Sequence, residues 1–166
     1  MPPPLHAAAL AGVSYRPATD DDLAFVSAVY ASTRLEEVAA SGWPAEVQQQ
    51  FLAHQADAQH RHYRTYYPNA EWLVIERGGE AIGRLYLEEW PSQIRLIDIS
   101  LLPRARGGGA GGAILADLQA MAKTAGKALS IHVERNNPAM RLYLRLGFAK
   151  MDEAGVYDLM EWRPEA

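Results

Sequence analysis

A glycine-rich segment at residues 106–112 is the part of the chain best suited to chemistry. It reads Arg-Gly-Gly-Gly-Ala-Gly-Gly and lies between a predicted strand and a predicted helix. Glycine permits positive φ and lets backbone N–H groups approach a ligand without a clash at Cβ. With the positive end of the following helix behind them, those N–H groups would form a cradle for an anion such as a pyrophosphate.

Three phosphate-binding motifs can be compared with this segment. A P-loop ends in Gly-Lys-Ser/Thr, whereas residues 112–114 read Gly-Ala-Ile and supply neither lysine nor hydroxyl. Gly107, Gly109 and Gly112 satisfy the dinucleotide fingerprint G-x-G-x-x-G, but that motif normally opens a longer βαβ array than the following residues can form. The coenzyme A turn, Arg/Gln-x-x-Gly-x-Gly/Ala, is matched by residues 106–111.

A second stretch favours the coenzyme over the dinucleotide. Residues 136–148 contain Asn-x-x-Ala-x-x-Leu-Tyr-x-x-x-Gly-Phe, and Pro103 precedes the glycine turn. Together the two segments resemble the GNAT (Gcn5-related N-acetyltransferase) superfamily over residues 94–148. The resemblance implies acetyl-CoA as co-substrate and direct attack of an amine on its thioester in a ternary complex. It also implies an α/β (α+β) fold, with one mixed, mostly antiparallel sheet of about six to seven strands flanked by about four helices.

The resemblance assigns roles to individual residues. It implies that Tyr143 is the general acid near the coenzyme sulfur, and that Asn136 contacts the coenzyme. The alternatives are a core tyrosine and a helix cap, although Asn137 could provide that cap. Backbone groups of Ile99 and Leu101 are expected to meet the pantetheine, with the Leu101 N–H as the better oxyanion donor. The remaining expected coenzyme contacts lie on the turn: Arg106, Gly107, Gly109, Ala110, Gly111 and Gly112.

The general base is less sharply defined by the sequence. An alkyl amine with a pKa near ~10 is mostly protonated at neutral pH, so a base or a water chain must remove a proton. Asp98, on the strand entering the turn, ranks slightly ahead of Glu88 and Glu89 at the end of the preceding strand. Each of these carboxylates could instead be a solvated or structural charge. His132, in a predicted buried strand, is interpreted as a core histidine.

Two positions depart from the family pattern. Gly108 stands where relatives often carry lysine or glutamine, and Gly112 stands where serine or threonine is common. Both remove side-chain contacts to phosphate, so we expect a modestly weaker affinity for the coenzyme. The positive charge would then come from arginines near the two motifs: Arg104, Arg106, Arg141 or Arg145.

Composition narrows the class of protein. The 166 residues suit one domain, and 49 % hydrophobic and 22 % charged residues are ordinary for a globular protein. A net charge of −4 gives no basic field for nucleic acid or anionic lipid. The chain has no cysteine, and the three histidines at 54, 60 and 62 lack a clustered fourth ligand, so no metal site is expected. A cytoplasmic location without membrane association is the default expectation.

The elements that must position these residues can be read from periodicity and turn signals. Residues 1–12 are expected to be a flexible leader, and residues 13–166 a single domain. Alternation in the third predicted strand places Ile94, Leu96, Asp98 and Ser100 on one face, and Arg95, Ile97, Ile99 and Leu101 on the other. Strands are predicted at 13–16, 71–76, 81–88, 94–102, 129–133, 148–151 and 156–162. Helices are predicted from Thr19, from Pro44, over about 109–125, and after Pro138.

The sequence therefore predicts an N-acetyltransferase that acts on a primary amine of a small molecule or peptide. Two alternatives stay open: a non-catalytic acyl-CoA-binding sensor, and a small dinucleotide-binding oxidoreductase. A homodimer is a further expectation, since dimers are common among look-alikes. Aromatic residues either flank an acceptor groove or serve packing and dimer contacts: Trp43, Trp90, Tyr63, Tyr66 and Tyr67.

Overall fold

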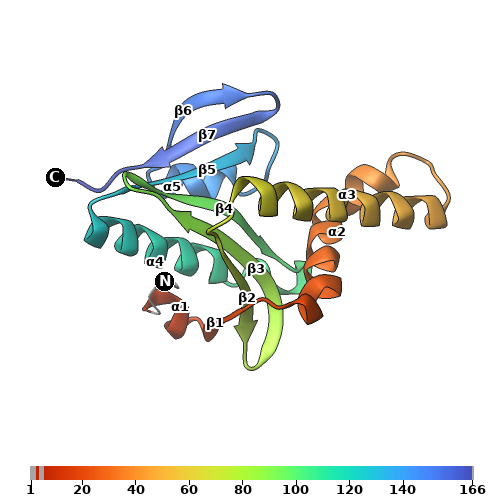
Figure 1. Ribbon diagram of the computed structural model, residues 1–166, viewed down its shortest axis with the longest axis horizontal. Coiled ribbons are helices and arrows are strands. Elements are labelled where there is room, and N and C mark those ends of the chain that lie inside the picture. The colour runs from red at the N-terminus through yellow and green to blue at the C-terminus, as the bar shows by residue number, and fades with distance from the viewer. Residues whose placement is uncertain (1–2, 4–5, 166) are drawn as a thin grey trace.

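One seven-stranded sheet organises the chain, with helices against both of its faces (Figure 1). The structure is a computed structural model that describes residue 3 and residues 6–165. The strand order is β1-β2-β3-β4-β5-β7-β6, and every neighbouring pair is antiparallel except β4 and β5. This mixed, mostly antiparallel sheet confirms the predicted fold class.

The secondary structure follows the predicted order closely. The strands are β1 (Val13–Pro17), β2 (Glu71–Arg77), β3 (Glu80–Glu89), β4 (Gln93–Leu101), β5 (Ala128–Glu134), β6 (Ala149–Ala154) and β7 (Tyr157–Trp162). The helices are α1 (Ala7–Leu10), α2 (Leu23–Ala39), α3 (Ala45–Tyr66), α4 (Ala110–Ala125) and α5 (Met140–Arg145), with 3-10 turns η1 (Asp20–Asp22) and η2 (Pro103–Ala105). The described residues thus form five α-helices, where about four were predicted.

Helix α1 is the addition, and a residue far along the chain holds it in place. The flexible leader predicted over residues 1–12 lies partly outside the described residues, but its later part is helical and packs against α4. Asp117 of α4 is only 2 % exposed and accepts hydrogen bonds from the N–H groups of residues 6, 7 and 8 at 3.2, 2.9 and 2.9 Å. No local sequence signal could announce an anchor more than 100 residues away.

The two faces of the sheet differ in chemistry. Leu85 and Leu87 of β3 lie in the apolar core with residues of α1, α4 and α5. The alternate side chains of β3 face α2 and α3, where Arg84 reaches the Val26 carbonyl of α2 at 3.3 Å and Gln59 of α3 at 2.6 Å. We call the sheet surface under and beside α2 and α3 the polar face.

A bulge in the β3–β4 pairing corrects the alternation predicted for β4. Tyr86 pairs with Asp98 but Leu87 pairs with Leu96, so Ile97 is an extra residue on β4. A bulge shifts the phase of the side chains by one. As a result Arg95 and Asp98 both lie on the polar face, whereas the prediction placed them on opposite faces. The later apolar residues of β4, Ile99 and Leu101, pack against the core.

Strands β4 and β5 are paired over only part of their lengths. The pairing runs from Gln93–Ala128 to Leu96–Ile131 and then stops. Residues 97–101 of β4 and 132–134 of β5 are not paired with each other, and we call this region the splay. Its closed end is at Leu96 and Ile131, and its open end lies toward the glycine turn that follows β4. The edge of β4 that faces β5 therefore has no strand partner over residues 97–101.

Candidate functional site

The glycine turn presents a row of free backbone N–H groups. Gly107 and Gly109 have φ of 79° and 83°, a conformation that other residues rarely adopt. Among the described residues, no backbone or side-chain acceptor bonds to the N–H groups of residues 107–112, and the first bond is from Ala113 to the Gly109 carbonyl at 3.0 Å. Helix α4 begins at Ala110, so its positive end faces the same space. The turn therefore fits the pyrophosphate of a coenzyme.

An arginine that sequence reasoning missed lies beside this turn. Arg77 ends β2, and its Nη1 is 3.8 Å from the position that a Cβ on Gly108 would occupy. Arg77 forms no ion pair or side-chain hydrogen bond with another described residue. Arg77 and Gly108 are about 30 residues apart, so only the β2–β3 pairing could have placed this cation at the turn.

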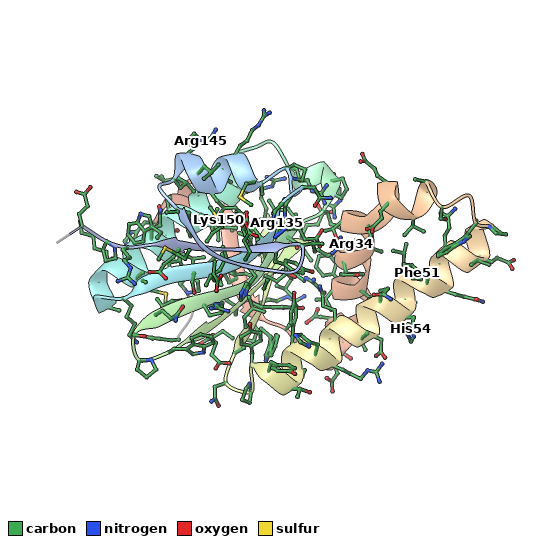
Figure 2. The ribbon with its side chains drawn as sticks, turned by 90° about the horizontal axis from the view of Figure 1, so that it is seen from above. Arg34, Phe51, His54, Arg135, Arg145 and Lys150 are labelled. Atoms are coloured by element: carbon green, nitrogen blue, oxygen red, sulfur yellow. The ribbon has the colours of Figure 1, made fainter. Side chains whose placement is uncertain are left out.

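The predicted arginines take different positions. Arg106 stays at the turn and donates from Nε to the Leu101 carbonyl at 3.0 Å. Arg104 is held away by an ion pair with Glu80 at 2.9 Å and by the Ala81 carbonyl. The other two, Arg141 and Arg145, are exposed on α5. Figure 2 shows Arg145 at the surface of the molecule.

Tyr143 is one of the buried core residues, and its hydroxyl keeps its proton. It is 3 % exposed, and its ring meets the ring of Phe148 edge-on with 5.4 Å between centroids. Its hydroxyl makes no hydrogen bond to a described residue. Burial, together with the negative charge of Asp98, raises the pKa of Tyr143 above its ordinary value. Next to α5, Asn137 caps the backbone through its bond from the Ala139 N–H at 2.8 Å, which leaves the exposed Asn136 without a capping role.

Asp98 lies in the splay but is neutralised by a neighbour. Its Oδ2 is 2.7 Å from Nη2 of Arg84, whose side chain is 6 % exposed. Tyr63 donates its hydroxyl to the same oxygen at 3.2 Å, and Ser100 donates to Oδ1 at 2.6 Å. Two hydroxyls and a buried guanidinium thus bond to the carboxylate, and both of its oxygens are already engaged.

Glu88 is a buried carboxylate on the polar face, and it forms no ion pair with any residue that the structure describes. It is 8 % exposed and faces Arg95 in the β3–β4 ladder. Its oxygens accept from the Asn69 N–H at 3.3 Å and from Nε1 of Trp90 at 3.0 Å. Of the three candidate bases named from the sequence, Asp98 pairs with Arg84 and Glu89 pairs with Lys127. Glu88 is the one that no described cation pairs directly.

His132 is exposed, in contrast to the predicted core histidine. It is the first residue of β5 beyond the paired segment, where β4 no longer covers it. Partial desolvation, with the cation of Arg95 nearby, lowers the pKa of His132 below its ordinary value. Its Nδ1 lies 3.2 Å from Nη1 of Arg95. Arginine can only donate, so Nδ1 accepts and Nε2 carries the hydrogen. No signal in the sequence could have shown where the β4–β5 pairing stops.

The predicted aromatic residues fall into two groups. Tyr67 and Trp90 stack with 6.3 Å between centroids, and Tyr63 lies near Tyr86 on the polar face. Trp43 packs instead on Phe51. Figure 2 shows Phe51 and His54 on the part of α3 that extends beyond the sheet. No group of residues in the described part of the chain could hold a metal ion. None of the described helices combines the length and apolar character needed to cross a membrane.

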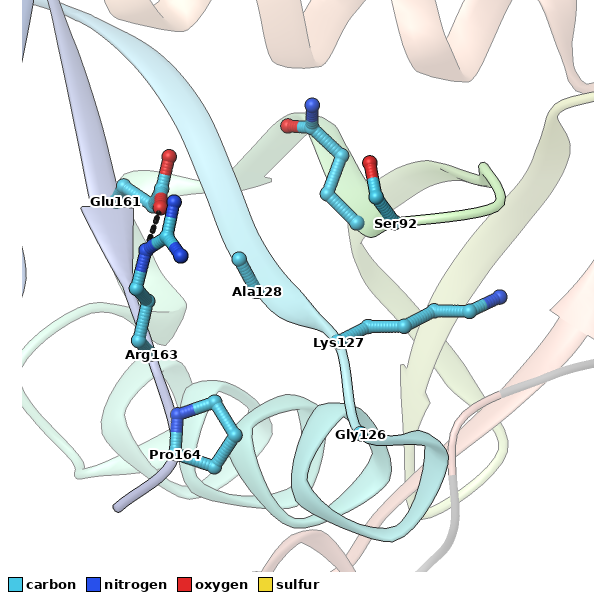
Figure 3. Close-up of a pocket in the computed structure, with 8 residues that line it drawn as sticks. Ser92, Gly126, Lys127, Ala128, Glu161, Arg163 and Pro164 are labelled. Atoms are coloured by element: carbon cyan, nitrogen blue, oxygen red, sulfur yellow. Dashed lines mark hydrogen bonds and ion pairs between the residues drawn. The ribbon is translucent and has the colours of Figure 1, made fainter. Parts of the chain in front are cut away.

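A cavity of about 290 Å³ lies at the other end of α4 from the glycine turn (Figure 3). Gly126, which ends α4, and Lys127 line it, together with Gln93 at the start of β4. Glu161 and Arg163, drawn in Figure 3, form an ion pair at its edge. This cavity is too far from the glycine turn to hold phosphates that bind there, but it borders the polar face at Gln93.

Several solved acetyltransferase structures share this fold. PaiA N-acetyltransferase from Thermoplasma acidophilum, solved with coenzyme A, is 17 % identical, with a TM-score of 0.68 over 92 % of this chain and 99 % of that one. An acetyltransferase from Thermus thermophilus is 17 % identical, with a TM-score of 0.65 over 92 % of this chain and 97 % of that one. A GNAT family acetyltransferase from Elizabethkingia anophelis, solved with acetyl-CoA bound, is 18 % identical, with a TM-score of 0.58 over 92 % of this chain and 99 % of that one. At these identities the structures show a shared fold.

Sequence comparison gives the stronger result. No curated protein sequence matches the chain significantly. The profile described as the Acetyltransferase (GNAT) family matches residues 33–148, which is more than half of the chain and includes the glycine turn and Tyr143. The chain belongs to the Acetyltransferase (GNAT) family.

Proposed function

We propose that this chain is an acetyl-CoA-dependent N-acetyltransferase that acetylates a primary amine. The observation that carries the proposal is the row of free N–H groups at residues 107–112, which opens onto the splay. Family membership supports acyl transfer in general. The structures with coenzyme A from Thermoplasma acidophilum and with acetyl-CoA from Elizabethkingia anophelis support the identity of the co-substrate.

The chain would hold the coenzyme along β4. The N–H groups of the turn would bind the pyrophosphate, with Arg106 beside them. The pantetheine would lie along Ile99 and Leu101, in the segment that β5 does not pair. Asn136, free of a capping role, would contact it from the β5 side. Acetyl-CoA supplies an activated acetyl thioester, whose reacting end would then lie toward the closed end of the splay.

Two side chains would move the protons. We assign Glu88 as the base, acting through water, because Asp98 is already paired with Arg84. Tyr143 remains protonated, since its pKa is raised, and would give its proton to the leaving sulfur. Asp98 then acts as a positioning residue that fixes Arg84 and the polar face.

Release of free coenzyme A thiol from acetyl-CoA, measured across a panel of primary amines, tests this function. We expect amine-dependent release. Binding of acetyl-CoA without turnover of any amine would favour the sensor instead. Thermal stabilisation by NAD(P)H but not by acetyl-CoA would favour the oxidoreductase. Mass measurement in solution would test the expected homodimer separately.

Arg77 is expected to supply the charge that Gly108 lacks. Its guanidinium lies beside the turn and bonds no side chain in the described part of the protein, so a phosphate there would gain a charge-assisted hydrogen bond. We expect Arg77→Gln to weaken coenzyme A binding about tenfold, or ~1.4 kcal/mol, with kcat nearly unchanged. Titration calorimetry with coenzyme A measures this effect. Arg61→Gln, on α3 with Asp57 as its partner, is the matched control. Equal affinities of Arg77→Gln and the unmodified protein would contradict the assignment.

A further inference from the structure

Arg95 is a buried cation to which no anionic side chain of the described residues bonds directly. It is 8 % exposed and forms no ion pair with a described residue. Its Nε donates to Ser130 Oγ at 3.0 Å, its Nη1 donates to Nδ1 of His132 at 3.2 Å, and its Cζ lies 4.7 Å from the centroid of the Trp90 ring. None of these neighbours carries a negative charge. Burying a charge without a counter-charge costs several kcal/mol, so this arrangement needs an explanation.

Glu88 faces Arg95 in the ladder but does not pair with it. Both side chains contact the indole of Trp90 instead. The indole Nε1 donates to Glu88 at 3.0 Å, while the guanidinium lies over the ring. Glu88 therefore offsets the charge of Arg95 only at a distance and satisfies none of its N–H groups.

The other arginines of the polar face show the usual solution. Arg84 pairs with Asp98 at 2.7 Å, and Arg34 pairs with Glu134. Both of those pairs join elements of the fold: Arg84 also bonds α2 and α3, and Arg34 links α2 to β5. Arg95 differs from them because its partners leave part of the guanidinium unused.

The unused part of Arg95 is fixed in place and reaches the surface. The hydroxyl of Ser130 donates its hydrogen to Oε1 of Gln93, so a lone pair of Ser130 Oγ is free to accept the hydrogen bond from Nε of Arg95. Nη2 bonds no described residue. Two described side-chain atoms are fully buried without a hydrogen-bond partner, the hydroxyl of Tyr15 and Nε of Arg84. Nη2 of Arg95 is not one of them, so it is not fully buried. The N–H groups of Nη2 are therefore accessible from the polar face.

The position of Arg95 relates it to the reaction. It directly precedes Leu96, the last residue of β4 that pairs with β5, and His132 directly follows the last paired residue of β5. The guanidinium thus lies at the closed end of the splay. If the pantetheine lies along β4 from the turn, the acetyl group reaches this end. An anion on Nη2 would then lie beside the acceptor amine.

We propose that the acceptor amine also carries a carboxylate, and that Arg95 binds this carboxylate on the polar face. The proposal rests on the N-acetyltransferase function proposed above and names its substrate class. One guanidinium matches one singly charged, planar carboxylate, and Nε2–H of His132 provides a second donor nearby. A phosphate dianion would bring more negative charge than Arg95 neutralises, next to Glu88.

The test compares matched acceptors that differ only in the carboxylate. Amino acids with the amine in α, β or γ position are each compared with their primary amides, and kcat/KM is measured for both. We expect the carboxylate to raise kcat/KM about 10- to 100-fold for the preferred acceptor. Arg95→Met should bring this ratio close to one, and Arg95→Lys should retain part of it. The ratio of the two kcat/KM values does not depend on the fraction of folded enzyme, because that fraction cancels. The difference in amine pKa between an amino acid and its amide is the same for the unmodified enzyme and for each variant, so it cannot cause a change in the ratio.

Arg163→Gln is the control, because Arg163 lies at the neighbouring cavity and already pairs with Glu161. We expect it to keep the ratio of the unmodified enzyme. Turnover of amines without preference for the carboxylate overturns the proposal, as does a preference lost in Arg163→Gln but kept in Arg95→Met. If no amine is acetylated, the proposed function fails first. Calorimetry with N-acetyl amino acids and their amides, in the presence of coenzyme A, then decides whether Arg95 binds a carboxylate.

Discussion

Replacing Tyr143 with phenylalanine is expected to lower kcat about 100-fold while leaving the affinity for acetyl-CoA nearly unchanged. The substitution removes only a hydroxyl. That hydroxyl has no hydrogen-bond partner among the described residues, and the edge-on contact with Phe148 is kept. We therefore expect the melting temperature to change little. Steady-state kinetics and a thermal melt on the same preparation separate the loss of an acid from a loss of fold.

The pH profile gives a second reading of the same assignment. Burial and Asp98 raise the pKa of Tyr143, so its hydroxyl stays protonated as the pH rises through the ordinary range for tyrosine. The rate of the unmodified enzyme should therefore not fall through Tyr143 ionisation below pH ~10. Tyr15→Phe is the matched control, since its buried hydroxyl also lacks a partner and lies on β1. Equal turnover by Tyr143→Phe and the unmodified enzyme would remove Tyr143 from the mechanism.

Most helices and strands could be predicted because the signals that begin and end them come from residues adjacent in the chain. The glycine pair at 78–79 takes positive φ and joins β2 to β3, as the turn chemistry predicts. Gly126, with φ of 67°, ends α4 at the predicted residue. The glycine turn likewise carries its own information, because its conformation depends on residues that are adjacent in the chain.

The features that could not be predicted depend on contacts between distant segments. The bulge at Ile97 follows from how β3 and β4 pair, and it moves Arg95 to the same face as Asp98. The exposure of His132 depends on where β5 leaves β4. Arg77 reaches the turn only because β2 lies two strands from β4. These side chains belong to the candidate site, and contacts between segments far apart in the chain bring them there, so the local sequence could not place them.

Replacing Asp98 with asparagine is expected to destabilise the protein strongly and to affect catalysis less. The substitution leaves the guanidinium of Arg84 buried without its counter-charge. Removing one partner of a buried ion pair costs about 3 kcal/mol or more. For a domain of this size that corresponds to a fall in melting temperature of roughly 6–12 °C. Calorimetric melting measures it, and kcat is determined well below the transition of the variant.

Comparison with two further variants decides what Asp98 does. If its role is to neutralise Arg84, then Arg84→Met combined with Asp98→Asn should recover part of the lost stability, because the uncompensated guanidinium of Arg84 is then also removed. Glu88→Gln should show the opposite pattern, with a larger loss of kcat and a smaller loss of stability, since Glu88 has no ion pair with a described residue to break. A variant Asp98→Asn that melts normally but has lost turnover would restore Asp98 as the base. The roles of the two carboxylates can therefore be separated, because one is held by a buried cation and the other is not.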